Sequence, residues 1–465
     1  MIFDQKPCII PFVFIAYAGV LELADEADSK SVGLITRAGS TPATGIKRFF
    51  YRNLFFRIFI VERRNAMKLP SFSITKPADR RYIPVADGLR TLCIFGIMWY
   101  HIWQQSWLQP SITVLGKELD FNWLVRCGYL LVDGMLMLSG FLLFLPYANA
   151  EFDNQTMPDI LTFYKKRAVR ILPSYYLSVF VMLFFVALPN GQYYSKDVFL
   201  IDFLSHLSLT HVFFPEAYSF TNLNVVLWTV SVEVQFYILF PFIARTFRKF
   251  PFITYSAMVL AAFCYRDLFA AKQADTTHLI NQLPAMLDVY ANGMLASYAY
   301  AALSRSIREN KAFSLLSTIL TVFAIVCIYH IFNDQMRESG YEALRLGQMS
   351  RRFLLSFMFS VFLLFAAFSL RPLQFLLGNR VMRFFSAISY QAYIWHSVIA
   401  LQLKKWRIPA YTAAENPQMY NEFVWQRQYT LLCFIAAILI GALLTYGFEK
   451  PVAKLLLRRK KHQLM

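Results

Sequence analysis

The chain has 465 residues, of which 57% are hydrophobic and only 16% are charged. Soluble domains carry about 25% charged residues, so this composition excludes a soluble globular enzyme, a disordered scaffold and a secreted domain. The formal net charge of +18 comes from 46 Lys and Arg residues against 28 Asp and Glu residues. Because the basic residues follow apolar runs, as they do at the cytoplasmic face of a membrane, they do not indicate nucleic-acid binding. The composition predicts an all-α polytopic protein embedded in a lipid bilayer.

Residues 1–66 differ from the rest of the chain. The apolar run 8–20 is too short to cross a bilayer, and no basic segment precedes it as in a signal peptide. With chosen synonymous codons, Ala38–Ala43 can be written as the T-arm of a transfer RNA and Ala27–Val32 as an anticodon arm. We therefore expect 1–66 to be an extension from a start codon placed too early, with translation beginning at Met67 and a membrane domain over 67–465. The alternative is a disordered basic leader.

Apolar runs of spanning length, about 17–22 residues each, recur from residue 88 onward. They predict ten transmembrane helices at 88–108, 128–147, 172–189, 225–246, 252–270, 283–303, 313–332, 352–370, 385–402 and 430–448. Basic clusters follow every second run, so the positive-inside rule predicts that both termini are cytoplasmic. Four arginines go against this rule, because they fall in the predicted external loop between the seventh and eighth runs: Arg337, Arg345, Arg351 and Arg352.

The first predicted helix carries ionisable residues that are costly in lipid and therefore candidates for function. Asp87 and Arg90 lie near its beginning, and His101 follows eleven residues after Arg90. At 100° and 1.5 Å per residue, Arg90 and His101 share a face and His101 lies about 16 Å deeper, near the middle of the membrane. A neutral imidazole there could act as a general base on a hydroxyl. The alternative is a histidine that only pairs with a neighbouring helix.

The fourth predicted helix places a carboxylate, Glu233, within the membrane. Residues four apart are neighbours on a helix, so Ser231 and Gln235 share one face and Thr229, Glu233 and Tyr237 share another. Glu233 could orient His101, stabilise an imidazolium or hold a substrate hydroxyl. The alternative is a structural ion pair with Arg90 or another cation.

Four basic residues, Lys165, Lys166, Arg167 and Arg170, head the third predicted helix on the cytoplasmic side. An arginine fork can bind the phosphates of a nucleotide-bearing donor, although membrane topology alone also explains the charges. Ser139 and Gly140 in the second helix are small residues that permit close helix packing. The aromatic residues before His396 are typical of an interfacial belt, which favours a structural role for that histidine.

No ligand spacing for a metal is present, because the six cysteines are scattered along the chain. We therefore expect no bound metal or other cofactor. Attack on a thioester does not require one.

The ordered set of motifs resembles the acyltransferase 3 family of bacterial membrane proteins over about residues 81–455. The resemblance rests on Asp87–Arg90 with His101, Ser139–Phe141, Arg167–Arg170, Leu227–Glu233 with Phe236 and Tyr237, Asn292–Met294, Ser389–Tyr390 with Trp395 and His396, and Glu449–Pro451.

This resemblance implies a multi-pass enzyme of the inner (cytoplasmic) membrane that O-acylates, usually O-acetylates, a carbohydrate-like acceptor of the cell envelope. The co-substrate would be cytoplasmic acyl-CoA, with acetyl-CoA the leading candidate. His101 would be catalytic with Arg90, assisted by Glu233, and Arg167 and Arg170 would bind the donor; Asp87, Ser231 and Tyr237 would support them. The alternative function is a proton-coupled transporter or exporter of a lipid-linked or small glycan, which could use the same residues as a relay.

Overall fold

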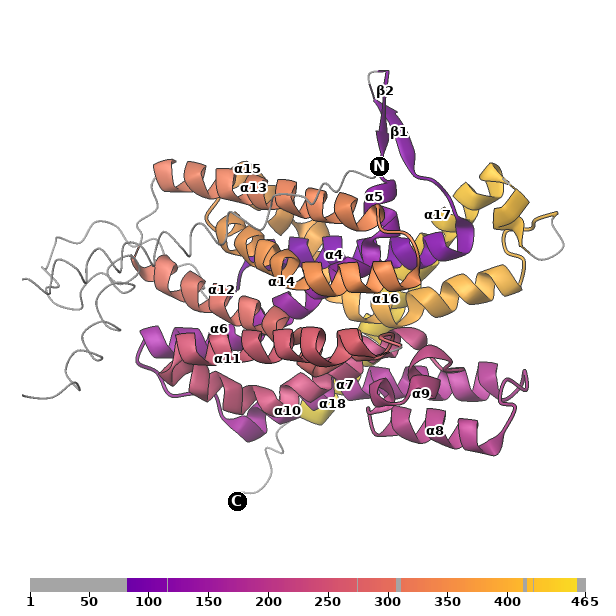
Figure 1. Cartoon of the computed structure of the whole chain (residues 1–465), viewed down its shortest axis with the longest axis horizontal. Coiled ribbons are helices and arrows are strands. Elements are labelled where there is room, and N and C mark those ends of the chain that lie inside the picture. Colours follow the sequence, from indigo (N-terminus) through magenta and orange to yellow (C-terminus); the bar gives the residue numbers. More distant parts are fainter. Residues whose placement is uncertain are drawn as a thin grey trace, which may run out of the picture. The chain divides into compact units, whose positions relative to one another are not determined.

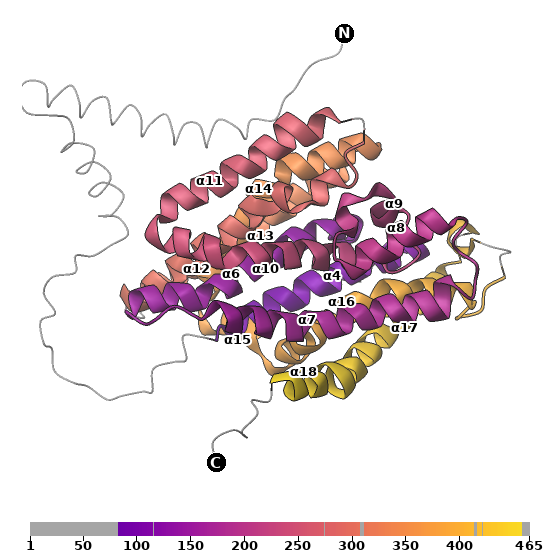
Figure 2. The ribbon, with the colours of Figure 1, turned by 90° about the horizontal axis from the view of Figure 1, so that it is seen from below.

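The structure is a computed structural model that describes residues 82–457, except 115, 274, 307–310, 413–415 and 421. The expected extension at 1–66 and the expected start at Met67 lie outside the described residues. Residues 75–465 form one compact unit, and the described part of the chain belongs to it. Its long helices lie broadly alongside one another, with α4 (Pro84–Ser106) and α16 (Arg380–Lys405) next to each other in the interior of the bundle (Figures 1 and 2).

The described chain is almost entirely helical, as predicted. The other α-helices are α5 (Asn122–Arg126), α6 (Leu131–Phe152), α7 (Ile160–Met182), α8 (Lys196–Leu207), α9 (Pro215–Ser219), α10 (Trp228–Lys249), α11 (Pro251–Phe263), α12 (Leu287–Ser306), α13 (Lys311–Met336), α14 (Tyr341–Ala366), α15 (Arg371–Gly378), α17 (Phe423–Leu444) and α18 (Lys450–Leu457). Turns of π-helix extend three of them, at η3 (Leu183–Ala187), η6 (Cys264–Phe269) and η11 (Thr445–Glu449). Short 3-10 turns form η2 (Gly128–Leu130), η4 (His211–Phe213), η5 (Val225–Leu227), η7 (Ala270–Lys272), η8 (Leu279–Asn281), η9 (Leu283–Met286) and η10 (Pro417–Tyr420).

One β-hairpin, which the sequence did not predict, projects from the bundle (Figure 1). Its strands β1 (Ser111–Val114) and β2 (Lys117–Asp120) are antiparallel, with Ser111 opposite Asp120, and all their side chains are exposed.

Seven helices of the described chain are long and apolar enough to cross a membrane. They are built on α6, α7, α10, α11, α13, α14 and α17, so the chain is a polytopic membrane protein. The other three predicted spans correspond to α4, α12 and α16, which have 23, 20 and 26 residues but are more polar. These three helices lie inside the bundle, where polar groups meet other protein groups instead of lipid. The count of ten spans and the cytoplasmic position of the termini stay predictions.

Two helices begin well before the runs that predicted them. The third predicted span starts at Ile160 instead of residue 172, and the eighth starts at Tyr341 instead of residue 352. In both cases the added turns are rich in charged residues, which a hydropathy window excludes although they continue the helix. At the beginning of α7, the backbone N–H of Thr162 donates to the Asp159 carboxylate at 2.8 Å and holds the pKa of this capping residue below its usual range.

The closest helix pair is α6 with α12, and two glycines permit it. A Cβ atom at Gly293 would lie 2.0 Å from the carbonyl oxygen of Met137, and one at Gly140 would lie 2.5 Å from that of Tyr290. Any larger side chain would therefore force the backbones apart. The predicted packing role is confirmed for Gly140, and this contact fixes the position of its neighbour Ser139.

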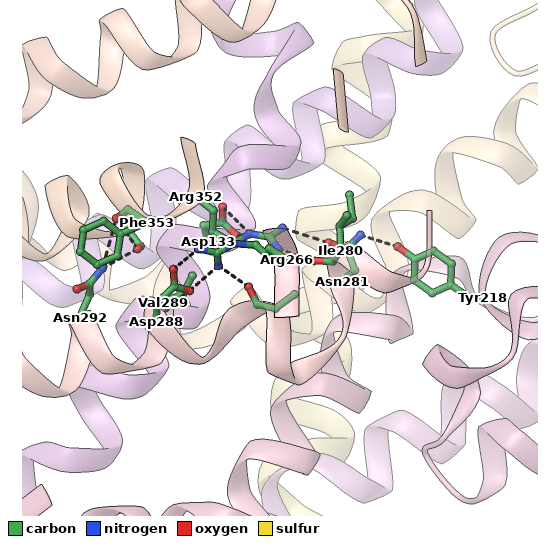
Figure 3. A network of polar contacts seen from close by, with 12 residues as sticks. Asp133, Tyr218, Arg266, Ile280, Asn281, Asp288, Val289, Asn292, Arg352 and Phe353 are labelled. Carbon is green, nitrogen blue, oxygen red and sulfur yellow. Dashed lines mark hydrogen bonds and ion pairs between the residues drawn. The ribbon is translucent and has the colours of Figure 1, made fainter. Parts of the chain in front are cut away.

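Two buried ion pairs join these helices to the rest of the bundle (Figure 3). Arg266 of η6 makes a two-point contact with Asp288 of α12, at 2.9 and 2.6 Å. Arg352 of α14 lies 3.2 Å from Asp133 of α6. All four side chains are almost fully buried, and each arginine also donates to a backbone carbonyl: Arg266 to that of Ala285 and Arg352 to that of Ile280.

The arginines that contradicted the positive-inside rule are explained by their partners. Arg345, Arg351 and Arg352 lie within α14 and not in a loop, which corrects their predicted position. Arg345 pairs with Asp275 at 2.9 Å and Arg351 with Glu338 at 2.6 Å, while Arg352 pairs with Asp133. A paired guanidinium contributes little net charge, so these residues carry less weight for topology than their number suggests.

We expect Arg266→Met to destabilise the protein by about 3–5 kcal/mol, because it leaves the Asp288 carboxylate buried without its counter-charge. The double variant Arg266→Met with Asp288→Leu should recover most of this loss, because neither charge remains. Thermal unfolding of the full chain in detergent, followed by tryptophan fluorescence, measures both effects.

Arg337→Met is the control for this experiment. Arg337 is 79% exposed and lies 3.7 Å from Asp334, so its loss should cost less than about 1 kcal/mol. Equal destabilisation by Arg266→Met and Arg337→Met would contradict the assigned role of the buried pair.

Candidate active site

A cavity of about 180 Å³ lies between α4, α6, α7, α10 and α16. Its charged lining consists of Arg90 from α4, Arg167 and Arg170 from α7, and Glu233 from α10. Four of the residues predicted for the site, far apart in the sequence, are thus brought to one space. Three guanidinium groups against one carboxylate leave a surplus of two positive charges in the lining, so the cavity suits an anion.

The Glu233 carboxylate is held by two hydroxyl groups. Ser139 of α6 donates to its Oε1 atom at 2.6 Å, and Tyr237 donates to the same atom at 2.5 Å. Both donors also line the cavity, as does Thr229, so the predicted face of α10 is confirmed. Ser139 was predicted only as a small packing residue, and its contact with Glu233 could not be inferred because it depends on how α6 and α10 are placed.

The two arginines of α7 occupy different depths of the cavity. Arg167 is half-buried, and its guanidinium lies 5.6 Å from the ring centre of Phe163 and 5.8 Å from that of Tyr237. Its Nε atom is buried without a partner. Arg170 is exposed although it lines the cavity, which places it at the rim. The prediction that these residues head the helix is wrong, because α7 begins seven residues before Arg167.

Asp87 and Ser231 stabilise the walls and do not line the cavity. The Asp87 carboxylate accepts hydrogen bonds from Tyr82 at 2.5 Å and from Ser386 of α16 at 2.6 Å, so it fastens α4 to α16. Ser231 is fully buried and donates to the Leu209 carbonyl at 2.5 Å, which ties α10 to the segment after α8. Its predicted neighbour on the helix face, Gln235, donates to it at 3.3 Å.

His101 lies outside this cavity, further along the same helix face. The lining follows α4 through Arg90, Ile94 and Ile97, and His101 comes one turn after Ile97. It is five residues from the end of α4, about 8 Å, and therefore nearer to that end than to the middle of the helix. The depth of His101 in the membrane stays a prediction.

The partner that orients His101 is Gln104, not Glu233. The His101 Nδ1 atom lies 3.0 Å from Oε1 of Gln104, and the Gln104 amide nitrogen donates to the Tyr100 hydroxyl at 3.0 Å. Because the amide oxygen only accepts, Nδ1 carries the hydrogen and Nε2 is left as the basic atom. The sequence could have indicated this contact, because His101 and Gln104 are three residues apart and share a helix face, whereas Glu233 lies on a different helix.

A second histidine faces His101. The ring centres of His101 and His396 are 5.1 Å apart, and His396 is only 1% exposed. The aromatic residues before it were predicted to form an interfacial belt, but Tyr393 and Trp395 are buried as well, so the belt does not account for this histidine.

The whole described domain matches a known family. The family model for an acyltransferase domain, Acyl_transf_3, matches residues 83–447. The chain therefore belongs to the acyltransferase 3 family and is an acyltransferase, as its motifs indicated.

The relatives agree with this assignment. O-acetyltransferase OatA of Staphylococcus aureus is 23% identical over 406 residues, covering 82% of this chain and 59% of OatA. "Putative acetyltransferase ORF330" of Acidianus two-tailed virus is 27% identical over 320 residues, covering 68% of this chain and 83% of ORF330. The chain thus spans little more than half the length of OatA. No solved structure is significantly similar to it.

We expect Gln104→Leu to release the His101 imidazole from its single tautomer, because the acceptor for the Nδ1 hydrogen is removed. Nitrogen-15 NMR of the full chain with labelled histidine rings should show Nδ1-protonated His101 in the wild type and mixed tautomers in the variant. His101→Asn identifies the signal.

Gln105→Leu is the matched control, since Oε1 of Gln105 lies 3.4 Å from the Lys404 amine instead of contacting His101. The same His101 signal in wild type and Gln104→Leu would show that Gln104 does not orient the ring.

Proposed function

We propose that the chain is a membrane O-acetyltransferase that transfers an acetyl group from cytoplasmic acetyl-CoA to a hydroxyl of a carbohydrate-like acceptor of the cell envelope. The observation that carries this proposal is the cavity in which three arginines meet a single carboxylate, one turn along α4 from a histidine. Family membership and relatives named as O-acetyltransferases support the reaction type.

The arginines are the proposed binding site for the phosphates of CoA. Guanidinium groups bind phosphate oxygens at two points, and the exposed position of Arg170 leaves it available to an entering donor. The apolar stripe of Ile94 and Ile97 then offers a path for the pantetheine arm toward His101, about 16 Å from Arg90 along the helix. If the beginning of α4 is cytoplasmic, as the charge pattern predicts, donor and acceptor approach from opposite sides.

The proposed reaction needs one proton-accepting group. Nε2 of His101 takes the proton of the acceptor hydroxyl while the oxygen attacks the thioester carbonyl. A carbon–oxygen bond forms, the carbon–sulfur bond breaks, and the departing thiolate of CoA takes the proton from the imidazolium. Gln104 holds Nδ1 during both steps, and Glu233 offsets part of the arginine charge in the cavity.

No cofactor is required by this scheme, and acetyl-CoA acts only as co-substrate. Among residues 82–457, apart from the undescribed gaps, no three His, Cys, Asp or Glu side chains gather in a way that could hold a metal. The absence of a bound metal remains a prediction. The proposed location is the inner, cytoplasmic membrane.

We expect His101→Ala to abolish transfer, with a loss of roughly 10²–10⁴-fold, because the general base is removed. Cells that lack the gene are complemented with wild type or His101→Ala at equal membrane levels. Alkali-releasable acetate on the envelope and release of free CoA by isolated membranes are then measured.

His330→Ala, which changes an exposed histidine of α13, is the matched control and should behave as wild type. Full activity of His101→Ala would overturn the mechanism. If wild-type membranes release no CoA, the reaction itself is wrong, and transport of a glycan becomes the function to test.

We expect Arg167→Gln to raise KM for acetyl-CoA about 10-fold with a smaller effect on kcat, because a charge-assisted hydrogen bond to the donor is worth about 1.5–3 kcal/mol. Initial rates of CoA release by the full chain in lipid nanodiscs give both constants.

Lys165→Gln removes a positive charge from the exposed side of α7, outside the cavity lining, and is the control. A similar rise in KM for both variants would indicate a general charge effect instead of a phosphate site in the cavity.

A further inference from the structure

His101 and His396 form a pair that the reaction described above uses only in part. His101 belongs to α4 and His396 to α16, and their rings lie 5.1 Å apart between centres at an angle of 48°. The two helices pack side by side, and Asp87 of α4 is hydrogen-bonded to Ser386 of α16. The position of one ring relative to the other is therefore set by the packing of two long helices.

Both imidazoles present the same atom to the space around them. The His396 Nδ1 atom lies 2.6 Å from the carbonyl oxygen of Tyr393, which can only accept a hydrogen bond, so Nδ1 carries the hydrogen. Gln104 fixes His101 in the same way. In each ring Nε2 is left with its lone pair.

The Nε2 atom of His396 is buried and has no hydrogen-bond partner. A buried acceptor without a donor lowers the stability of the fold, so such atoms are rarely left unused in a folded protein. A charged ring would be still less favourable, since its Nε2 hydrogen would also lack a partner. What the atom requires is a neutral hydrogen-bond donor that reaches it beside His101.

Each histidine of the pair lies one helical turn from a residue that lines the arginine cavity. Ile97 and Tyr393 line that cavity, and His101 and His396 follow them by one turn on their helices. The Tyr393 hydroxyl accepts a hydrogen bond from Thr229 at 2.8 Å and is thereby held in place. The histidine pair is thus separate from the proposed phosphate site but contiguous with it.

We infer that His396 binds the acceptor, and that the acceptor presents two adjacent hydroxyl groups, a vicinal diol such as a sugar ring carries. One hydroxyl donates to Nε2 of His101 and is acylated. Its neighbour donates to Nε2 of His396, keeps its proton and holds the diol in place. This inference rests on the proposed acetyl transfer and adds the chemistry of the acceptor, because two rings 5.1 Å apart, each with a proton-free Nε2 atom, match two hydroxyl donors.

His396 would then be a specificity-determining residue. Sites built to hydrogen-bond a substrate hydroxyl discriminate strongly against compounds that lack it, because the buried acceptor is left unpaired. The proton transfer of the reaction does not pass through His396. Its loss should therefore weaken acceptor binding and leave donor binding unchanged.

The test compares His396→Met with His396→Gln in the full chain in lipid nanodiscs. Methionine keeps an apolar side chain of similar length, whereas the glutamine amide oxygen can accept a hydrogen bond where Nε2 did. The donor is radiolabelled acetyl-CoA, and the acceptor is a cell-envelope fraction from gene-deleted cells, supplied over a range of concentrations. The amounts of label incorporated and CoA released give separate KM values for donor and acceptor.

We expect His396→Met to raise KM for the acceptor fraction about 10-fold or more, with KM for acetyl-CoA within about 2-fold of wild type. His396→Gln should restore most of the acceptor affinity. A purely structural role would move both KM values or lower the amount of folded protein, and glutamine would not rescue it. Unchanged acceptor KM in His396→Met, or equal shifts for donor and acceptor, overturns the inference.

A second measurement tests the diol directly. Periodate cleaves vicinal diols, and borohydride then reduces the aldehydes to isolated hydroxyls. An acceptor fraction treated in this way should lose at least about nine-tenths of its labelling by the wild type, while borohydride alone should have no effect. Full labelling after periodate contradicts a vicinal diol. If the wild type releases no CoA with any fraction, the proposed transfer itself fails, which is a different result from either of these.

Discussion

The constraint on which this structure depends is that charge inside a membrane must be paired. Arg266 with Asp288 and Arg352 with Asp133 are buried ion pairs in which each arginine also donates to a backbone carbonyl, so neither arginine exposes an unpaired charge to lipid. The pairs join four segments that are distant in sequence, α6, η6, α12 and α14. Removing one partner of such a pair leaves a buried charge without its counter-charge and lowers the stability of the protein by more than the intact pair adds relative to apolar residues. The pairs therefore specify how these helices fit together.

The same constraint orders the helices by polarity. Three long helices that are not apolar enough to count as spans by themselves, α4, α12 and α16, lie in the interior. Helix α17 packs against α4 and α16, and α11 packs against α12. Close contact of α6 with α12 at Gly140 and Gly293 then fixes Ser139, and with it one of the two hydroxyls that hold Glu233. Helix packing thus determines the shape of the cavity. Its positive charge comes from three arginines, which a single carboxylate in the lining offsets only in part.

The interior divides into a basic cavity and a histidine pair, stacked along α4 and α16. This division suits the proposed reaction between an anionic, nucleotide-bearing donor and a neutral hydroxylated acceptor, since each half offers the groups that the proposed ligand requires. The two imidazoles are oriented without carboxylates, by an amide oxygen and a backbone carbonyl. Neutral partners hold the tautomer without adding charge to a region of low dielectric constant.

The sequence by itself determined the membrane class, the positions of the long helices and the family, because apolar runs and ordered motifs are local properties of the chain. It also identified Arg90, Arg167, Arg170, Glu233 and Tyr237, which do line one cavity. Only the tertiary structure decided the partners from other helices: that Ser139 holds Glu233, and that His396 faces His101 instead of an interface. Helix ends were missed where charged turns continue a span, as in α7 and α14. The turn of 100° per residue in an α-helix predicts which residues share a face. Which other helix packs against that face depends on contacts between residues far apart in the sequence.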